Sequence, residues 1–199
     1  MFVQVIQGKT DDPAALRGQM DRWEQELKAG AKGYLGSTMG VTAGGDVIGI
    51  ARFESAEAAA ANSTRPEQGE WFAQTEKLFS GPVTFHDTSE VDVTLVGGSD
   101  DAGFVQVMQG RIHDLAALRK MEEQFMPEMP KQRPDVIGSV RARYGDGEFT
   151  DFIYFTSEAE AREGESKMSE QSNADMGEWE KTMQVDRYFD ITDPWLYSP

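Results

Sequence analysis

The chain has 199 residues and a formal net charge of −16, which divides evenly between its two halves. A negative field of this size repels phosphate backbones and anionic lipid surfaces, so we expect neither nucleic acid nor a membrane as a partner. The sequence holds no cysteine, which excludes disulfides, thiolate metal sites and cysteine nucleophiles.

The chain opens on a predicted strand rather than on a targeting segment. Residues 2–8 are rich in β-branched side chains and closed by Gly8, which is typical of a strand with two partly apolar faces. The sequence shows neither the basic start and long apolar run of a signal peptide nor the roughly 20 apolar residues of a membrane span. We therefore expect a cytoplasmic protein.

The rest of the first half alternates helical and extended patterns. Asp12 and Pro13 predict a helix start, and an apolar face at spacings of four, three and four continues that helix. Two extended runs around a Gly-Gly turn predict a hairpin. The elements expected after the first helix are strands at 34–42 and 47–53, helices at 55–62 and 67–79, and a long strand at 82–95 with a break near Asp87.

The second half repeats the first. Phe2–Lys9, with the sequence FVQVIQGK, returns as Phe104–Arg111, with the sequence FVQVMQGR, and the offset of 102 residues holds through the hairpin. The offset becomes 108 where Trp71 meets Trp179, so the second copy gains six residues between these points. Two copies indicate a pseudo-symmetric pair rather than a solenoid, because stacked arrays need about three or more repeats.

Two domains of ordinary size follow from this repeat. We predict a first unit over residues 1–96, a short polar linker over 97–103 and a second unit over 104–199. In the second unit we expect a helix capped by Asp114. Its later elements are predicted as strands at 136–144 and 148–156, a mostly helical segment at 157–183 and a last strand at 185–192.

The element order predicts an α+β fold. Strand, helix, strand, strand, helix, strand is the order of a ferredoxin-like unit, with a four-stranded antiparallel sheet and helices on one face. The open sheet face is partly apolar and must be covered. We predict that the two sheets pack together as an intrachain pseudo-dimeric α+β barrel, so that the protein is a monomeric pseudo-dimer or a weak homodimer.

Three sequence features resemble one known family. They are the opening strands FVQVIQG and FVQVMQG, the strand-to-helix step RFESAEA with its partner YFTSEAE, and the helical pair Trp71 and Trp179. The chain resembles the dimeric α+β barrel superfamily and, within it, the antibiotic biosynthesis monooxygenase-like proteins, as a fused version of what relatives build from two chains. This resemblance implies oxidation of aromatic, polyketide-like substrates without metal or flavin.

The second helical region of the first half holds the residue types that match this chemistry. The resemblance implies catalytic roles for Asn62 and Trp71 and a substrate-binding role for Arg65. An asparagine amide can hold an oxygen of a substrate or of a peroxide intermediate, and a tryptophan can stack on a flat ligand. The alternative is that Trp71 belongs to the core and that Asn62 and Arg65 end a helix, since both are ordinary stop signals.

Other candidates lie where the two halves differ. His86 is a candidate catalytic base or ligand because an imidazole titrates near pH 6.5, and the alternative is a solvent-facing side chain. Arg141 and Arg143 share one strand face and are candidates for binding a carboxylate or another anion of the substrate. The alternative for these arginines is cross-strand pairing with Glu148 or Asp151.

We expect the two halves to be unequal and free of cofactors. Trp179 is a further substrate-binding candidate, but Asn62 falls opposite Gly164 or Glu170, neither of which is an amide. No metal motif or phosphate-binding loop is present. Haem-degrading relatives carry an axial histidine after the helical tryptophan, and the matching stretch of this chain has none.

Two hypotheses for function follow, and both predict a small-molecule ligand. The first is a cofactor-independent monooxygenase-like enzyme that acts on aromatic or polyketide-like substrates, with the first half more active. The second is a non-catalytic small-molecule-binding protein or a degenerate family member, which the unequal halves and the lack of a clear acid/base pair favour. A purely structural role is third.

Overall fold

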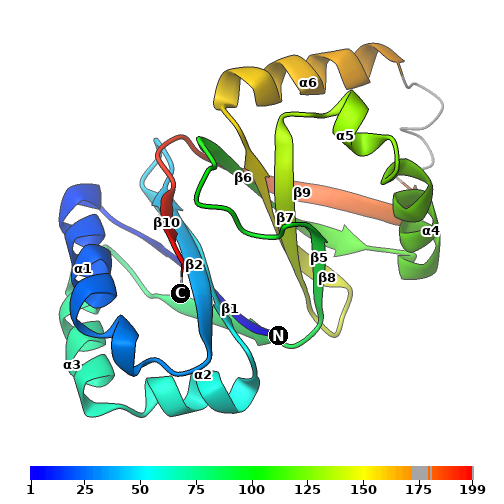
Figure 1. Cartoon of the computed structure of the whole chain (residues 1–199). Coiled ribbons are helices and arrows are strands. Elements are labelled where there is room, and N and C mark those ends of the chain that lie inside the picture. The colour runs from blue at the N-terminus through cyan, green and yellow to red at the C-terminus, as the bar shows by residue number, and fades with distance from the viewer. Residues whose placement is uncertain (172–178, 180, 199) are drawn as a thin grey trace. The chain divides into compact units, whose positions relative to one another are not determined.

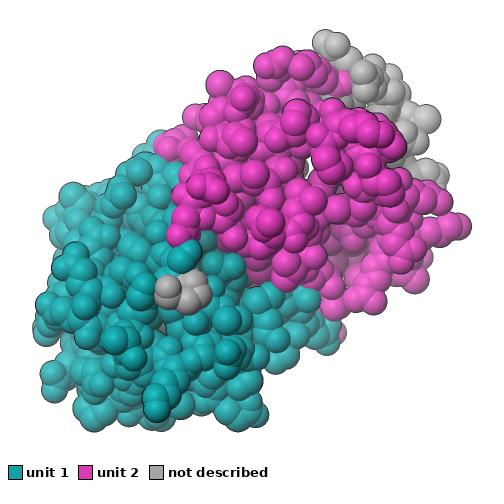
Figure 2. Space-filling view, viewed as in Figure 1, with its two compact units in different colours: residues 1–91, 193–199 teal, residues 92–192 magenta. Residues whose placement is uncertain are grey.

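The computed structural model describes residues 1–171, 179 and 181–198, and the chain divides into two compact units. Unit 1 combines Met1–Val91 with the C-terminal segment Asp193–Pro199, and unit 2 spans Asp92–Thr192 (Figure 2). The predicted boundaries at residues 96 and 104 differ from this division, because a strand that follows each half in sequence joins the sheet of the other half.

Unit 1 has a βαββααβ order to which one late strand is added. Its elements are β1 (Phe2–Lys9), α1 (Pro13–Glu26), β2 (Tyr34–Val41), β3 (Asp46–Phe53), α2 (Ala56–Ser63), α3 (Pro66–Thr75), β4 (Thr84–Thr88) and β10 (Trp195–Tyr197) (Figure 1). One-turn 3-10 helices, Lys28–Gly30 and Glu76–Leu78, follow α1 and α3.

Local signals in the sequence explain where the helices of unit 1 begin. The Asp12 carboxylate accepts a hydrogen bond from the backbone N–H of Ala15 at 2.9 Å, and a proline occupies the first turn of α1. Ser55 caps α2 in the same way through the N–H of Ala58. Pro66 starts α3 directly after α2, so these two helices turn sharply and can enclose a space between them.

The sheet of unit 1 is antiparallel, in the order β10-β2-β3-β1-β4. In this register Gln4 on β1 lies opposite Ala51 on β3 and Asp87 on β4. The turn between β2 and β3 needs Gly45, whose φ of +80° favours glycine. Helices α1, α2 and α3 lie on one side of this sheet (Figure 1).

Unit 2 repeats this arrangement. Its elements are β5 (Val91–Leu95), β6 (Phe104–Ile112), α4 (Leu115–Phe125), α5 (Met129–Gln132), β7 (Val136–Arg143), β8 (Glu148–Phe155), α6 (Glu158–Gln171) and β9 (Met183–Ile191). The sheet order is β5-β7-β8-β6-β9. Gln106 lies opposite Ile153 and Asp190, as Gln4 lies opposite its own two partners, so the repeat seen in the sequence is also a repeat in register.

Each unit gains a fifth strand at the edge of its sheet. The single strand predicted over 82–95 is two strands, of which β4 joins the sheet of unit 1 and β5 lies beside β7 in unit 2. The short strand β10 pairs with β2, with Trp195 opposite Met39 and Tyr197 opposite Ser37. An added strand satisfies the N–H and C=O groups that an open sheet edge leaves unpaired.

Two apolar clusters fill the space between sheet and helices in unit 1. One is built on Leu16, Met39, Val47 and Trp195, and the other on Ala31, Tyr34, Phe53 and Ala59. Both clusters supply side chains to the cavity described in the next section.

The predicted α+β class is confirmed, with two antiparallel sheets in βαββαβ-like units. The packing of the two sheets as a barrel stays a prediction. The helix predicted over 157–183 is confirmed from Glu158 to Gln171, while 172–178 and 180 lie outside the described residues. No helix in the described ranges is long and apolar enough to cross a bilayer.

Candidate functional site

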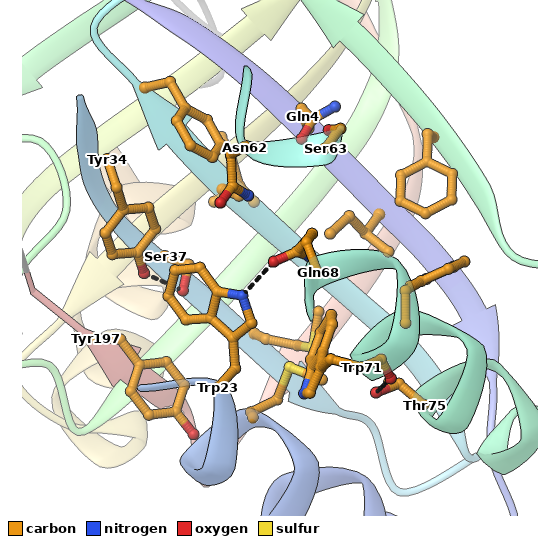
Figure 3. Close-up of a pocket in the computed structure, with 18 of the residues that line it drawn as sticks. Gln4, Trp23, Tyr34, Ser37, Asn62, Ser63, Gln68, Trp71, Thr75 and Tyr197 are labelled. Atoms are coloured by element: carbon orange, nitrogen blue, oxygen red, sulfur yellow. Dashed lines mark hydrogen bonds between the residues drawn. The ribbon is translucent and has the colours of Figure 1, made fainter. Parts of the chain in front are cut away.

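A cavity of about 420 Å³ lies in unit 1 between the sheet and the three helices (Figure 3). Many aromatic side chains line it, among them Trp23, Tyr34, Trp71, Phe72, Phe85 and Tyr197. A volume of this size matches the pockets that hold small organic ligands, which are usually apolar with a few placed polar groups. Apart from Tyr197 on β10, these residues come from the segment between α1 and β4.

The rings are held by edge contacts and by hydrogen bonds at their polar ends. Trp23 and Tyr34 meet edge to face with centroids 4.9 Å apart, and Phe72 and Phe85 do so at 5.6 Å. The indole N–H of Trp23 donates to Gln68 Oε1 at 2.7 Å (Figure 3). Because the polar ends are satisfied, these side chains present apolar surface to the cavity.

Asn62 brings an amide donor into this apolar space. It lies near the end of α2, is 6% exposed and lines the cavity (Figure 3). Its Oδ1 accepts a hydrogen bond from Arg65 Nη1 at 2.9 Å. Since an arginine can only donate, this contact identifies the amide oxygen as the atom that faces Arg65. The amide nitrogen, Nδ2, is then the atom that can donate a hydrogen bond elsewhere. Within the described ranges, Nδ2 donates to no protein atom.

The guanidinium of Arg65, the predicted substrate-binding residue, makes hydrogen bonds within unit 1. Its guanidinium donates to the carbonyl of Leu27 at 3.1 Å and to the carboxylate of Glu67 at 3.0 Å, besides its bond to Asn62. Arg65 is not among the cavity-lining residues. The guanidinium therefore links α2, α3 and the end of α1 through these hydrogen bonds.

Trp71 lies on α3 and lines the cavity together with Asn62, as expected from the sequence. Its indole N–H donates to the backbone carbonyl of Gln19 on α1 at 2.8 Å. The residue is 9% exposed, so the core interpretation also holds: one side of the ring packs and the rest borders the cavity. The two predictions for Trp71 are compatible.

His86 lies on the wrong face of β4 for the predicted site. Its neighbours Phe85 and Asp87 line the cavity, and strand alternation points His86 to the opposite side of the sheet. The imidazole is exposed and is not part of the cavity wall. His86, a candidate catalytic base or ligand in the sequence, is therefore not part of this cavity, and the alternative of a solvent-facing side chain describes its position.

The two arginines of β7 are taken up by carboxylates. Arg141 Nε donates to Asp151 across the strand pair at 2.9 Å, as the alternative interpretation expected, and Nη1 donates to Glu122 at 2.6 Å. Burial alone would lower the pKa of Arg141, but the charges of Asp151 and Glu122 outweigh it and raise the pKa. Arg143 donates to Asp92 on β5 at 2.7 Å.

Trp179 differs from its counterpart in unit 1. It is 37% exposed, whereas Trp71 is 9% exposed. Its backbone carbonyl accepts a hydrogen bond from the Thr182 hydroxyl. The neighbouring residues 172–178 lie outside the described part of the chain, and a substrate contact of Trp179 stays a prediction.

Several polar groups of the cavity were not predicted from the sequence, among them Gln4, Asp87 and Tyr197. Gln4 Nε2 donates to both carboxylate oxygens of Asp87 at 3.2 and 3.3 Å, and the Tyr197 hydroxyl donates to Asp21 at 2.7 Å. Burial, with the hydrogen bond and charge of Asp21, raises the pKa of Tyr197. The alternation of side chains along a strand could have predicted Asp87, because it lies two residues after Phe85 and so shares its face of β4. No local sequence pattern distinguishes Tyr197.

Clusters of three or more histidine or carboxylate side chains placed to hold a metal ion do not occur among the residues that the structure describes. The carboxylate that lines the cavity, Asp87, is bound by an amide.

Solved structures with a similar fold are known, although the sequence comparisons find no match. No protein-family model matches the sequence, and no curated protein does. A putative monooxygenase from Lactobacillus acidophilus NCFM superposes with a TM-score of 0.72 at 11% identity, covering 99% of this chain and 96% of its own. One from Fusobacterium nucleatum superposes with a TM-score of 0.73 at 7% identity, over 99% and 94% of the two chains.

A third similar structure names the family directly. It is an uncharacterised ferredoxin-fold protein from Listeria monocytogenes, described as related to antibiotic biosynthesis monooxygenases, with a TM-score of 0.51 at 11% identity over 100% and 95% of the two chains. This chain has the fold of these proteins. The resemblance predicted from the sequence is thus confirmed for the fold over the full length of both repeats, and the activity is a separate question.

Proposed function

We propose that the cavity of unit 1 binds a flat aromatic small molecule and oxidises it with molecular oxygen, without a bound cofactor. The observation that carries this proposal is an apolar, aromatic-walled cavity with one oriented amide donor, Asn62, at its surface. The fold shared with putative monooxygenases supports the choice of reaction.

The cavity suits a ligand of fused or linked aromatic rings. Edge-to-face pairs leave ring faces on which a planar ligand can stack, and each such contact is worth about 1 kcal/mol beyond the area it buries. The satisfied indole N–H groups of Trp23 and Trp71 mean that an apolar ligand leaves no donor of these rings unpaired. Binding is therefore expected to favour planar hydrocarbon frameworks with few polar groups.

Asn62 supplies the polar contact that the reaction needs. An anthrone-type substrate reacts through its enolate, which forms when the ring CH2 releases a proton to solvent. The enolate oxygen carries negative charge, and Nδ2 of Asn62 would donate to it or to a peroxide formed from it. In the net reaction a ring CH2 becomes a carbonyl: one atom of O2 enters the product and the other leaves as water. The substrate supplies the electrons, and the protein holds and orients it.

A binding protein without turnover is the second candidate. His86 lies outside the cavity, and the raised pKa of Tyr197 keeps its phenol neutral at ordinary pH. Neither group thus serves as a base inside the cavity. This hypothesis predicts the same aromatic ligands and the same Asn62 contact, but no oxygen consumption.

Oxygen uptake with 1,8-dihydroxyanthrone and a naphthohydroquinone separates the two hypotheses. We expect uptake above the enzyme-free rate, and a loss of about 100-fold in kcat for Asn62→Ala, as for removal of one oxyanion donor. His86→Gln is the matched control and should keep full activity, because His86 is exposed and outside the cavity. Ligand-dependent thermal shifts without any uptake across these substrates would contradict the enzyme hypothesis and favour the binding protein.

A further inference from the structure

We propose that the ligand of the unit 1 cavity carries a basic nitrogen, and that Asp87 binds its positive charge. This proposal deepens the proposed function, on whose cavity it rests, by naming the substrate class. Asp87 lines the cavity from β4, and its carboxylate accepts from the neutral amide of Gln4. In the part of the chain that the structure describes, no lysine, arginine or histidine pairs with it.

Unit 2 contains the same carboxylate with its cation in place. Gln106 Nε2 donates to Asp190 at 3.1 Å, as Gln4 donates to Asp87, and the register of the two pairs in their sheets is the same. In unit 2, however, Arg162 Nη2 also binds Asp190, at 2.5 Å. The repeat therefore shows which kind of group fits beside this Gln-Asp pair.

The residue of unit 1 that corresponds to Arg162 carries no charge. The caps of the two helices fix the alignment, since Ser55 accepts from the third residue after it, and Ser157 does the same in unit 2. By this alignment Arg162 corresponds to Ala60, whose methyl group cannot reach or neutralise Asp87. The chain thus keeps the carboxylate and its amide partner in unit 1 and omits the arginine.

The surroundings of the vacant position also suit a cation. The guanidinium of Arg162 lies 5.1 Å from the ring centroid of Phe104, and the counterpart of that ring in unit 1 is Phe2. Phe85, Phe72 and Asp87 all line the cavity, and the two rings contact each other, so a ligand with an ammonium group at Asp87 would share the cavity with aromatic rings. The net charge of −16 further attracts cations to this protein.

These contacts point to a planar aromatic molecule with an aminoalkyl or guanidino substituent. Its rings would occupy the aromatic part of the cavity, and its charged nitrogen would take the place that the Arg162 guanidinium holds in unit 2. An alkyl ammonium stays protonated at neutral pH, so Asp87 would pair with a full charge.

Two probes of nearly the same shape test the proposal: 2-naphthylmethylamine, which is cationic, and 2-naphthalenemethanol, which is neutral. Affinities for the full chain are measured by isothermal titration at pH 7 and low salt. We expect the amine to bind about fivefold tighter than the alcohol, the factor for a partly exposed ion pair of about 1 kcal/mol. Added salt should reduce this preference because it screens the pair.

Substitutions test whether Asp87 causes the preference for the amine over the alcohol. Asp87→Asn should abolish it, and Asp11→Asn, which removes the same charge at an exposed position that does not line the cavity, should preserve it. Ala60→Arg installs the arrangement of unit 2 and should also abolish it, because the new guanidinium takes up Asp87. Equal affinities of both probes for the unmodified protein, or a preference that survives Asp87→Asn, would overturn the proposal.

The outcome is independent of catalysis. If the amine preference holds and no oxygen is consumed with an aminomethyl-substituted anthrone, the ligand class stands and the oxidation fails. If neutral anthrones are oxidised and the probes show no preference for the amine, the oxidation stands and the ligand class fails.

Discussion

Unit 1 and unit 2 fill one part of the same scaffold in opposite ways. On α1, β2 and β3 of unit 1, the methionines Met20 and Met39 border the cavity, and the latter packs over Gly49. At the matching positions unit 2 carries three charged side chains, Glu122, Arg141 and Asp151. These form two ion pairs around a single guanidinium that is 8% exposed. The elements correspond between the units, and the side chains at these positions differ: methionines border a cavity in unit 1, and charged side chains pair with one another in unit 2.

The helix that follows each hairpin shows the same contrast. Asn62 in unit 1 corresponds to Gly164 in unit 2, and an arginine side chain, that of Arg133, lies where a side chain at position 164 would go. Arg133 is held by Asp135 at 2.7 Å. The two units thus show that the same arrangement of elements accommodates either side chains that border a cavity or a set of buried ion pairs.

Breaking the triad of unit 2 is expected to have the largest effect. Asp151→Ala leaves a buried guanidinium with one carboxylate, at a cost of about 3 kcal/mol in the free energy of unfolding. Replacing the whole triad by the residues of unit 1, as Glu122→Met, Arg141→Met and Asp151→Gly together, should cost less than this single change, because no unpaired charge remains. Equilibrium unfolding in urea measures both. A triple variant less stable than Asp151→Ala would show that the two packings are not interchangeable.

Exchanging Asn62 and its counterpart is expected to have a smaller, asymmetric effect. A Cβ at position 164 would lie 2.4 Å from Arg133 Nε, so Gly164→Asn must displace a buried ion pair, at a cost of about 2 kcal/mol. Asn62→Gly creates no clash and loses one hydrogen bond to Arg65, about 1 kcal/mol. Thermal unfolding of both variants checks the order. Equal losses would mean that Arg133 moves aside easily and that unit 2 can also open.

The repeat made the architecture predictable, but not the strand exchange. Each unit has its own turn, cap and alternation signals, so element types and the βαββαβ order follow from local patterns. Strand alternation in residues 91–95 is the same whichever sheet they join. The choice of β7 as partner depends on contacts far away in sequence, and the three-residue β10 is too short to give a pattern.

The candidate site was predictable where residue type alone was decisive. Asn62 and Trp71 were chosen because their residue types and places match the family that the chain resembles, and both line the cavity. Arg65 was assigned to the ligand because the sequence shows its charge but not its hydrogen bonds. His86 was assigned by chemistry, although alternation with the apolar Phe85 already places it on the other face of the strand.

The added edge strands offer the mildest test of the comparison. The carbonyl of Tyr197 approaches Gly36, and that of Gly97 approaches Gly138, so these two residues correspond in the two units. Unit 1 therefore has a phenol, bonded to Asp21, where unit 2 has no side chain. Below about pH 10 the phenol is neutral in both the folded and unfolded states. Tyr197→Phe should then cost about 1 kcal/mol, the value of the lost hydrogen bond.

The raised pKa of Tyr197 gives this cost a pH dependence. Above about pH 10 the unfolded chain ionises its tyrosine while the folded chain keeps it neutral, so the unfolded state gains stability. The advantage of the natural protein over Tyr197→Phe should therefore shrink as the pH rises from 9 to 11 (about one unit either side of the ordinary tyrosine pKa). Urea unfolding of both proteins across this interval measures the difference. A constant difference would show that the phenol of β10 ionises as readily in the fold as in the unfolded chain, and that this strand leaves it open to solvent.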